Sequence, residues 1–240
     1  MTKNISSKEI VLKGVAASNG VSIGQAIVFS KAKIIIEEIN LRSIAEVEDE
    51  LAKFKNALEK AKQDIVAYQE KLKSVLGVEN SKIFDAHILM LNDKALIQDI
   101  EKQVRAERKN VEFIFNRTTK RYITAISSMQ DSYFRERATD IKDISDRVLF
   151  NLQNKDRGHT GYDKFTGQRI IVADEITPTD IAELDKEKIL AIVTETGGKT
   201  SHTAIMARSI GIPAVLGIPS GITDKVKNGD IVVVDGYIGT

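Results

Sequence analysis

The residues with the clearest chemical potential lie in one stretch, which runs from Gly197 to His202 and reads Gly-Gly-Lys-Thr-Ser-His. It follows the apolar run 189–194, so the glycine pair predicts a tight turn at the end of a strand. The residues after the turn have helical spacing, and Gly211 is expected to end that helix. The order strand, turn and helix therefore places a histidine at the start of a helix.

That position of His202 has a chemical meaning. Backbone N–H groups in a first helical turn have no intrahelical partner, and the helix dipole leaves a partial positive charge there. A phosphoryl group attached to His202 would be stabilised by these donors, and a neutral imidazole nitrogen can attack phosphorus. A single histidine is more often a surface or core residue than a nucleophile. The combination with Gly-Gly, Thr-Ser and a helix start is a much narrower pattern.

The stretch GGKTSHTAIMARSIGIPAVLG resembles the phosphohistidine signature of the Enzyme I family, the phosphoenolpyruvate-protein phosphotransferases of the bacterial phosphotransferase system. It is also similar to the signature of pyruvate phosphate dikinases and phosphoenolpyruvate synthases. The resemblance implies that His202 is the phosphorylated residue and that four neighbours support the phosphate, namely Gly197, Gly198, Thr200 and Ser201. Both hydroxyl residues are also ordinary helix caps, so a structural interpretation stays open for each.

Other stretches separate these relatives. Four of them resemble Enzyme I, namely residues 14–28, 83–93, 133–149 and 176–184. The dikinases share the phosphohistidine domain but not the helical insert. The resemblance implies an enzyme in which phosphoenolpyruvate phosphorylates His202, which then phosphorylates a histidine of the carrier protein HPr, as the first step of sugar uptake. Phosphoenolpyruvate, Mg²⁺ and the main dimer contact would belong to a C-terminal domain, so no cofactor is expected in this chain, and the isolated chain is expected to be a monomer.

Residues around the motif carry further expectations. Arg208 lies six residues after His202, on another face of the helix, and is expected to form a structural salt bridge. The chain departs from the family pattern at Ile181, where many members have a threonine that supports the histidine, and at Asn80, where many have a lysine. Thr177 or Thr179 could supply the missing hydroxyl.

The carrier-facing surface is expected on the helical part of the chain. By resemblance it contains Glu79, Asp85, His87, Arg137 and Asp140, and an ordinary solvated helix face is the alternative for each. His159 has no motif around it and is expected in solvent. The three histidines have no spacing typical of a metal site.

Composition excludes several classes. The chain has 240 residues, with 35 Lys and Arg against 34 Asp and Glu, and this net charge of +1 does not favour nucleic acid as a partner. Cysteine is absent from the sequence, which removes disulfides and thiolate sites. No apolar run reaches membrane-spanning length and the first ten residues do not resemble a signal peptide, so a cytoplasmic protein is expected.

The two ends of the chain differ from its middle. Glycines and short β-branched runs in 1–38 and 154–240 predict an α/β domain, which by resemblance is a swivelling phosphohistidine domain. The insert 39–153 predicts an all-α bundle that begins with a long helix at residues 44–76. Its apolar seam would also suit a dimeric coiled-coil adaptor, but Phe54 and Tyr68 and the helices that follow favour packing within the chain.

Overall fold

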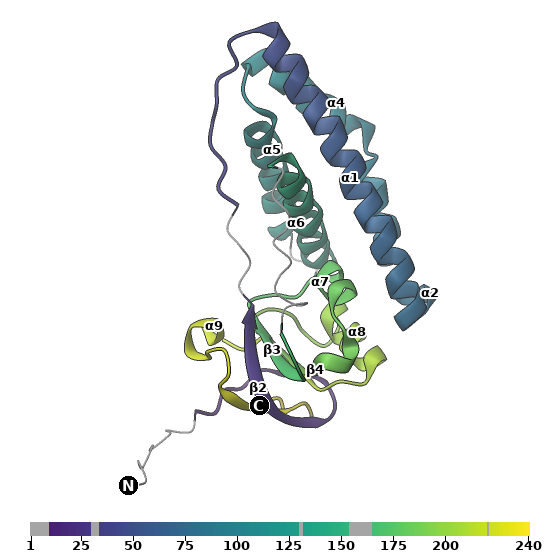
Figure 1. The fold of residues 1–240 in the computed structure, drawn as a ribbon, viewed down its shortest axis with the longest axis vertical. Coiled ribbons are helices and arrows are strands. Elements are labelled where there is room, and N and C mark those ends of the chain that lie inside the picture. Colours follow the sequence, from purple (N-terminus) through teal and green to yellow (C-terminus); the bar gives the residue numbers. More distant parts are fainter. Residues whose placement is uncertain (1–9, 30–33, 130–131, 154–164, 220) are drawn as a thin grey trace. The chain divides into compact units, whose positions relative to one another are not determined.

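The computed structural model describes residues 10–29, 34–129, 132–153, 165–219 and 221–240 (Figure 1). It does not describe the side chains at 75–76, 79–80, 132–136 and 182–183. The chain divides into two compact units. The α/β unit contains residues 1–30, 166–176 and 185–240, and the helical unit contains 31–165 and 177–184.

The α/β unit is built on a six-stranded sheet with the order β1-β5-β4-β3-β2-β6. The strands are β1 (Val15–Ser18), β2 (Val21–Phe29), β3 (Arg169–Ala173), β4 (Ile189–Thr194), β5 (Ala214–Leu216) and β6 (Ile231–Asp235). The inner pairs β2–β3, β3–β4 and β4–β5 are parallel, whereas the outer pairs β1–β5 and β2–β6 are antiparallel. Parallel strands place their carboxyl ends at one edge, and the turn that carries His202 leaves the carboxyl end of β4.

The core of this unit explains why the central strands are almost entirely apolar. Side chains on β3, β4 and β5 are buried on both faces, as in Ile170, Ile171 and Val172, so they show no polar alternation. A buried cluster contains Ala26, Ile170, Val172, Ala191, Val193, Val215, Ile218, Ile222 and Val234. The short helices η1 (Lys186–Lys188), α8 (His202–Ile210) and α9 (Ile222–Lys225) complete the unit.

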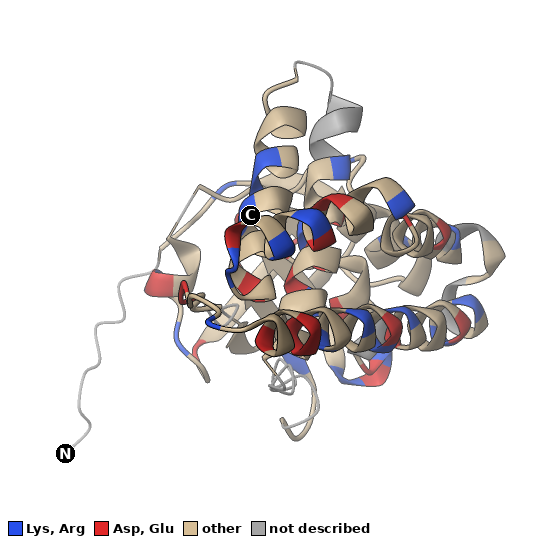
Figure 2. Ribbon diagram, turned by 90° about the horizontal axis from the view of Figure 1, so that it is seen from above, with Lys and Arg blue, Asp and Glu red and all other residues tan. Residues whose placement is uncertain are grey.

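The helical unit contains a long helix and its partners. These are α1 (Ile44–Leu76), α2 (Val78–Ser81), α3 (Ile83–Leu91), α4 (Lys94–Glu107), α5 (Val111–Ser127), α6 (Ser132–Leu152) and α7 (Pro178–Glu183). Ser43 caps the start of α1 and Gly77 ends it with φ 83°, so the helix has the predicted range 44–76. Both signs of charge are interspersed over the helices (Figure 2). Among the described residues, no helix has a stretch apolar enough to cross a bilayer.

The seam of α1 is buried within its own chain. Leu51, Phe54, Ala61 and Ile65 are at most 2% exposed, and Phe54 contacts the ring of Phe115 on α5 at a centroid distance of 5.7 Å. Helix α1 packs most extensively against α6, α2 and α3. Intramolecular packing of these four residues is therefore confirmed, and it leaves none of them for the core of a dimeric coiled coil.

The division differs from the predicted boundaries 1–38, 39–153 and 154–240 in one informative segment. Helix α7 and its cap belong to the helical unit, although they lie between β3 and β4 in sequence. The Thr179 hydroxyl donates to Asp143 on α6 at 2.6 Å, and Thr179 is fully buried. This long-range contact, rather than chain order, assigns the segment to the helices.

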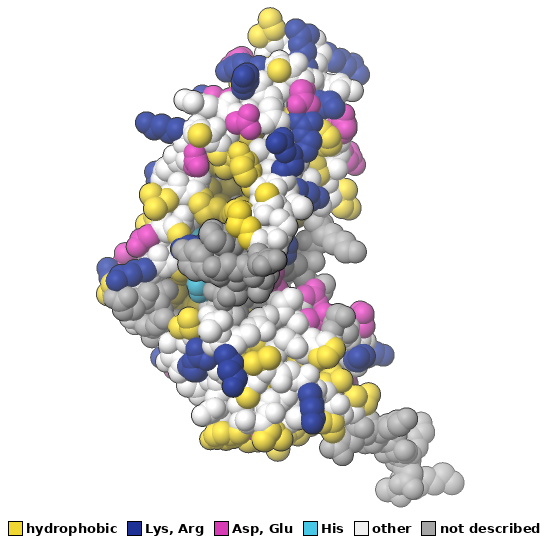
Figure 3. All heavy atoms as spheres, turned by 180° about the vertical axis from the view of Figure 1, so that it is seen from behind, with side chains coloured by type: hydrophobic (Ala, Val, Ile, Leu, Met, Phe, Trp, Pro, Cys, Tyr) yellow, Lys and Arg dark blue, Asp and Glu magenta, His cyan; other side chains and the backbone are white. Residues whose placement is uncertain are grey.

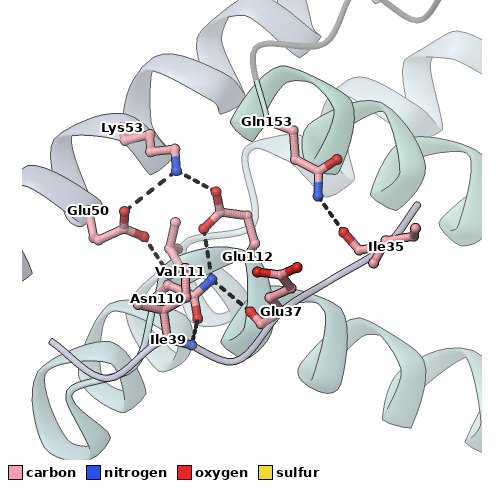
Figure 4. A network of polar contacts seen from close by, with 9 residues as sticks. All are labelled: Ile35, Glu37, Ile39, Glu50, Lys53, Asn110, Val111, Glu112 and Gln153. Carbon is pink, nitrogen blue, oxygen red and sulfur yellow. Dashed lines mark hydrogen bonds and ion pairs between the residues drawn. The ribbon is translucent and has the colours of Figure 1, made fainter.

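A polar network fastens residues 35–39 to the bundle (Figure 4). Asn110, 5% exposed, accepts a hydrogen bond from the Ile39 amide at 2.9 Å and donates to the Glu37 carbonyl at 3.1 Å. The side-chain amide of Asn110 also donates to Glu112, which forms an ion pair with Lys53. Burial acts to lower the pKa of Lys53, but its hydrogen bond and charge contact with Glu112 outweigh burial and raise the pKa above its ordinary value.

Asn110→Ala should destabilise the helical unit by about 2 kcal/mol, because the Ile39 amide and the Glu37 carbonyl lose their partner. Urea unfolding followed by circular dichroism at 222 nm measures the change. The control is Asn56→Ala on the exposed side of α1, which should leave stability unchanged or slightly higher. Equal midpoints for Asn110→Ala and the parent chain would contradict this role of the network.

Candidate active site

The turn between β4 and α8 holds the candidate nucleophile. Gly197 has φ 105°, a conformation that favours glycine, and the Ser201 amide bonds back to the Gly198 carbonyl at 3.1 Å. Ser201 is the N-cap of α8, and His202 is the first residue of the helix, as predicted. The His202 side chain is half-buried.

Ser201 shapes the helix start through its side chain. Its hydroxyl accepts from the Ala204 amide at 3.3 Å and donates to the Gly198 carbonyl at 2.8 Å. The first helical bond across the cap runs from the Ile205 amide to the Ser201 carbonyl, so the amides of residues 202–204 precede the intrahelical ladder. The sequence left open whether Ser201 is a helix cap, and in the structure Ser201 is the N-cap of α8. Thr200 is exposed in the turn, and its role at a phosphate stays a prediction.

The two glycines of the motif are not equivalent. A Cβ at Gly197 would need the left-handed φ and would lie 3.4 Å from Leu216, whereas a Cβ at Gly198 would meet no atom within 4 Å. The expected steric requirement of the turn therefore holds for Gly197 and not for Gly198. The implied role of Gly198 beside a phosphate stays a prediction. The sequence analysis missed Gly217, whose Cβ would lie 2.9 Å from the Gly197 carbonyl oxygen.

Arg208 fixes the turn from the far side of α8. Its guanidinium donates to the Ala17 carbonyl on β1 at 2.8 Å and to the Lys199 carbonyl in the turn at 3.0 Å. The expected structural role is present, but the expected salt bridge is replaced by two backbone carbonyls. Both bonds come from one terminal nitrogen of the guanidinium, whose two N–H groups can point at two separate acceptors.

Two further contacts that the sequence analysis missed hold the site. The Thr203 hydroxyl donates to the Ile176 carbonyl at 2.9 Å, which fastens the first turn of α8 to the segment after β3. Glu195 accepts from the amides of Gly221 and Thr223 at 2.9 and 3.3 Å. Desolvation acts to raise the pKa of Glu195, but these donors and the Thr223 hydroxyl outweigh it and lower the pKa. Its carboxylate thus links the end of β4 to the start of α9.

The hydroxyls proposed to replace the missing family threonine have other partners. Thr177 donates to Asp180 at 2.8 Å within the capping box of α7, and Thr179 donates to Asp143. Both threonines are at most 1% exposed. Each hydroxyl proton is thus used inside the helical unit, and whether either oxygen orients His202 stays a prediction, because a hydroxyl that donates can still accept. Ile181 is a buried apolar residue there.

The predicted carrier-facing residues separate by burial. Asp85 is exposed on α3 and accepts from Gln69 at 2.7 Å, and the Arg137 side chain is 38% exposed on α6. His87 and Asp140 are 0% and 1% exposed, so their assignment to a contact surface is corrected.

These two buried residues form a network behind Arg137. His87 Nε2 lies 3.7 Å from Asp140, whose other carboxylate oxygen lies 3.6 Å from the Arg137 guanidinium. Phe84, His87 and Leu91 form the buried stripe of α3, a spacing that could have placed His87 inside. The Glu79 side chain and His159 lie outside the described part of the chain.

Comparison with known proteins gives consistent matches. Residues 13–137 match the family model described as PEP-utilising enzyme, N-terminal, and residues 165–239 match the PEP-utilising enzyme, mobile domain. The chain is 37% identical over 232 residues to phosphoenolpyruvate-protein phosphotransferases of Bacillus sp. (strain S) and Geobacillus stearothermophilus. These matches cover 97% of this chain and 39% of each relative. The chain thus spans about two fifths of the length of these relatives.

Solved structures agree with this result. An NMR solution structure of Enzyme I (nEIt) is 37% identical, with a TM-score of 0.74, and the match covers 95% of this chain and 91% of that one. The N-terminal domain of Enzyme 1 - Nitrogen matches with a TM-score of 0.60 at 24% identity, covering 96% of this chain and 92% of that chain, which indicates a shared fold alone.

Arg208→Gln should loosen the turn before His202 while the sheet remains folded, because at least one of the two carbonyl contacts is lost. We expect faster amide hydrogen exchange in residues 197–203 and a loss of stability of about 1 kcal/mol. Arg208→Lys should restore only one contact. Ser209→Ala, an exposed change on the same helix, is the control. Unchanged exchange in the turn of Arg208→Gln would exclude the clamp.

Proposed function

The chain belongs to the family of PEP-utilising enzymes, and from this premise we propose that it is the N-terminal part of a phosphoenolpyruvate-protein phosphotransferase. In this proposal His202 accepts a phosphoryl group from phosphoenolpyruvate and passes it to a histidine of HPr. The observation that carries the proposal is the position of His202. It follows the turn at Gly197 and is the first residue of α8, directly after the N-cap Ser201. Such a helix start favours an anion.

Each transfer is a substitution at phosphorus. A ring nitrogen of His202 forms a bond to phosphorus while the bond to the donor oxygen of phosphoenolpyruvate breaks, and the phosphoryl group then leaves for the carrier imidazole. Catalysis of this kind depends mainly on positioning and charge stabilisation, because the side chain need only supply an electron pair. Arg208 and Thr203 supply positioning by fixing the turn and the first helical residues through backbone carbonyls.

The remaining parts of the activity belong to the longer protein. The chain matches 39% of the relatives' length, which supports an arrangement in which another domain holds phosphoenolpyruvate and Mg²⁺ and forms a homodimer. A cytoplasmic location and the first step of sugar uptake are part of the same proposal. The match of residues 13–137 includes most of the helical unit, which supports a phosphotransferase over a dikinase or synthase.

The carrier HPr is proposed to bind the helical unit near Asp85 and Arg137. Both side chains are accessible and occur in stretches that resemble the carrier-facing segments of the family. Glu79 remains in the proposed surface by resemblance. His87 and Asp140 are left out as direct contacts because they are buried.

Phosphorylation of the chain tests the central proposal. HPr carrying labelled phosphate on its histidine should transfer label to one site of this chain, and His202→Ala should abolish that transfer. His159→Ala is the matched control and should keep the label. The label should be stable to base and labile to acid, as a phosphohistidine is. Phosphoenolpyruvate with Mg²⁺ should label the isolated chain at most weakly.

Two results would contradict this assignment. Label retained by His202→Ala would exclude His202 as the acceptor. Strong labelling by phosphoenolpyruvate alone would exclude the dependence on a further domain.

Association with HPr tests the docking surface. Asp85→Lys should slow association, because HPr is expected to present a basic patch, and rising salt should weaken binding of the parent chain within a Debye length of about 10 Å at 0.1 M. Asp99→Lys makes the same charge change on the exposed side of α4 and serves as the control. Stopped-flow association rates measure the difference. Equal rates for Asp85→Lys and the parent at low salt would remove Asp85 from the interface.

A further inference from the structure

The loop after β6 in the α/β unit reverses the direction of the chain. It contains residues 236–239, and the Asp235 carboxylate accepts hydrogen bonds from two of its amides at 2.8 and 3.1 Å. Beyond the loop, the Asp235 amide donates to the Thr240 carbonyl at 2.7 Å, and the Thr240 amide donates to the Asp235 carbonyl at 3.2 Å. A reciprocal pair of this kind is a hydrogen-bonded pair of an antiparallel hairpin. Thr240 therefore begins a return along β6.

The side of β6 that this return follows has unused backbone groups. In the sheet order β1-β5-β4-β3-β2-β6, the strand β6 is an edge with β2 as its neighbour. Alternate residues direct their backbone groups toward β2, as Gly236 does when its amide donates to the Gly20 carbonyl at 2.8 Å. Ile231 and Val233 alternate with these residues, so their N–H and C=O groups point away from β2. Within the described ranges, no strand pairs with that side of β6.

The opposite edge of the sheet comes close to the same loop. Strand β1 is that edge, and the Gly14 amide just before it donates to the Gly239 carbonyl at 2.9 Å. A Cβ at Gly236 would clash with the Ser18 carbonyl oxygen at the other end of β1. The sheet therefore curls until its two edges approach each other at the loop. One further strand between them would close the sheet, and closure removes both exposed edges.

Apolar side chains are exposed beside this edge. The cross-strand partners Ile23 and Val233, and Ile231 on the same face, are between 56% and 69% exposed. Ile10 and Val11 before β1 are exposed as well. Hydrophobic side chains gather on the α/β unit in the lower part of Figure 3. The sequence of β6, IVVVD, has no lysine or proline, the residues that natural edge strands use against unwanted pairing. Such an edge is suited to being covered by another strand.

We propose that the free side of β6 is a strand-addition site, and that its occupant is the polypeptide that continues from Thr240 in the longer protein. The chain covers 39% of the relatives' length, which supports such a continuation. The pair formed by Asp235 and Thr240 sets the register, so the second and fourth residues after Thr240 pair with Val233 and Ile231. The inference rests on the proposed function only in that the chain is part of a longer protein.

The register also predicts the character of the added strand. Opposed residues of an antiparallel pair have their side chains on the same face of the sheet. The first and third residues after Thr240 are opposite Val234 and Val232, which face the core cluster of the α/β unit. We therefore expect these two residues to be apolar.

Amide hydrogen exchange measured by NMR tests the proposal on two proteins. One is the 240-residue chain, and the other is the same chain extended by the ten residues that follow it in the longer protein. In the 240-residue chain the amides of Ile231 and Val233 should exchange fast. The amides of Val232 and Val234 should exchange slowly in both proteins, because they bond to β2. The extension should slow Ile231 and Val233 by at least about tenfold. Equal exchange of these two amides in both proteins would overturn the proposal.

Proline variants separate the free side of β6 from its paired side. Val233→Pro removes an N–H group that only the extended chain uses, so it should lower the melting temperature of that chain by about 2 to 4 °C more than that of the 240-residue chain. Val232→Pro is the matched control, because it removes an amide that bonds to β2 and should destabilise both chains alike. An equal effect of Val233→Pro on both chains would contradict the strand addition.

Two other occupants would give different results in the 240-residue chain. Pairing with a second copy would slow the exchange of Val233 as the protein concentration rises. Pairing with residues 1–9 would slow it until those residues are deleted. Either result would overturn the proposal. Labelling of His202 by HPr does not require the added strand, so that assay separates a failure of this proposal from a failure of the proposed function.

Discussion

The position of His202 depends on the backbone of the turn that leaves β4. Gly197 adopts a left-handed φ, Gly217 leaves space for the Gly197 carbonyl, and Ser201 closes the turn onto the first helical residue. Arg208 then ties this turn to β1. None of these contacts involves the imidazole itself. The start of α8, on which His202 lies, is therefore positioned by backbone geometry and by the hydrogen bonds of its neighbours.

The two units are stabilised by different means. The α/β unit has a cluster of β-branched residues between sheet and helices, whereas the helical unit is organised around the seam of α1. The helical unit also holds residues 35–39 through Asn110, in addition to its own helices. Each unit thus has its own buried core and its own hydrogen bonds, which are the properties of separate domains.

Sequence reasoning was most successful where periodicity or turn chemistry is local. It predicted the long helix at residues 44–76, which is α1, and the position of His202 at the start of α8. It assigned α7 to the α/β domain because it had no means of seeing the contact from Thr179 to Asp143. It gave Arg208 a carboxylate partner for the same reason, since the actual acceptors are carbonyls from a strand nearly 200 residues away and from the turn.

The predicted carrier-facing surface shows how burial limits what resemblance can transfer. A family match carries over residue types, but His87 and Asp140 lie inside the bundle, and Arg137 is the accessible end of their network. Substitution of a buried carboxylate would disturb folding as well as binding, since a buried polar group that loses its partner costs about 1 to 3 kcal/mol. An exposed residue such as Asp85 has a much smaller structural role, because its contact with Gln69 lies at the surface. A change at Asp85 therefore reports on association more directly than a change at either buried residue.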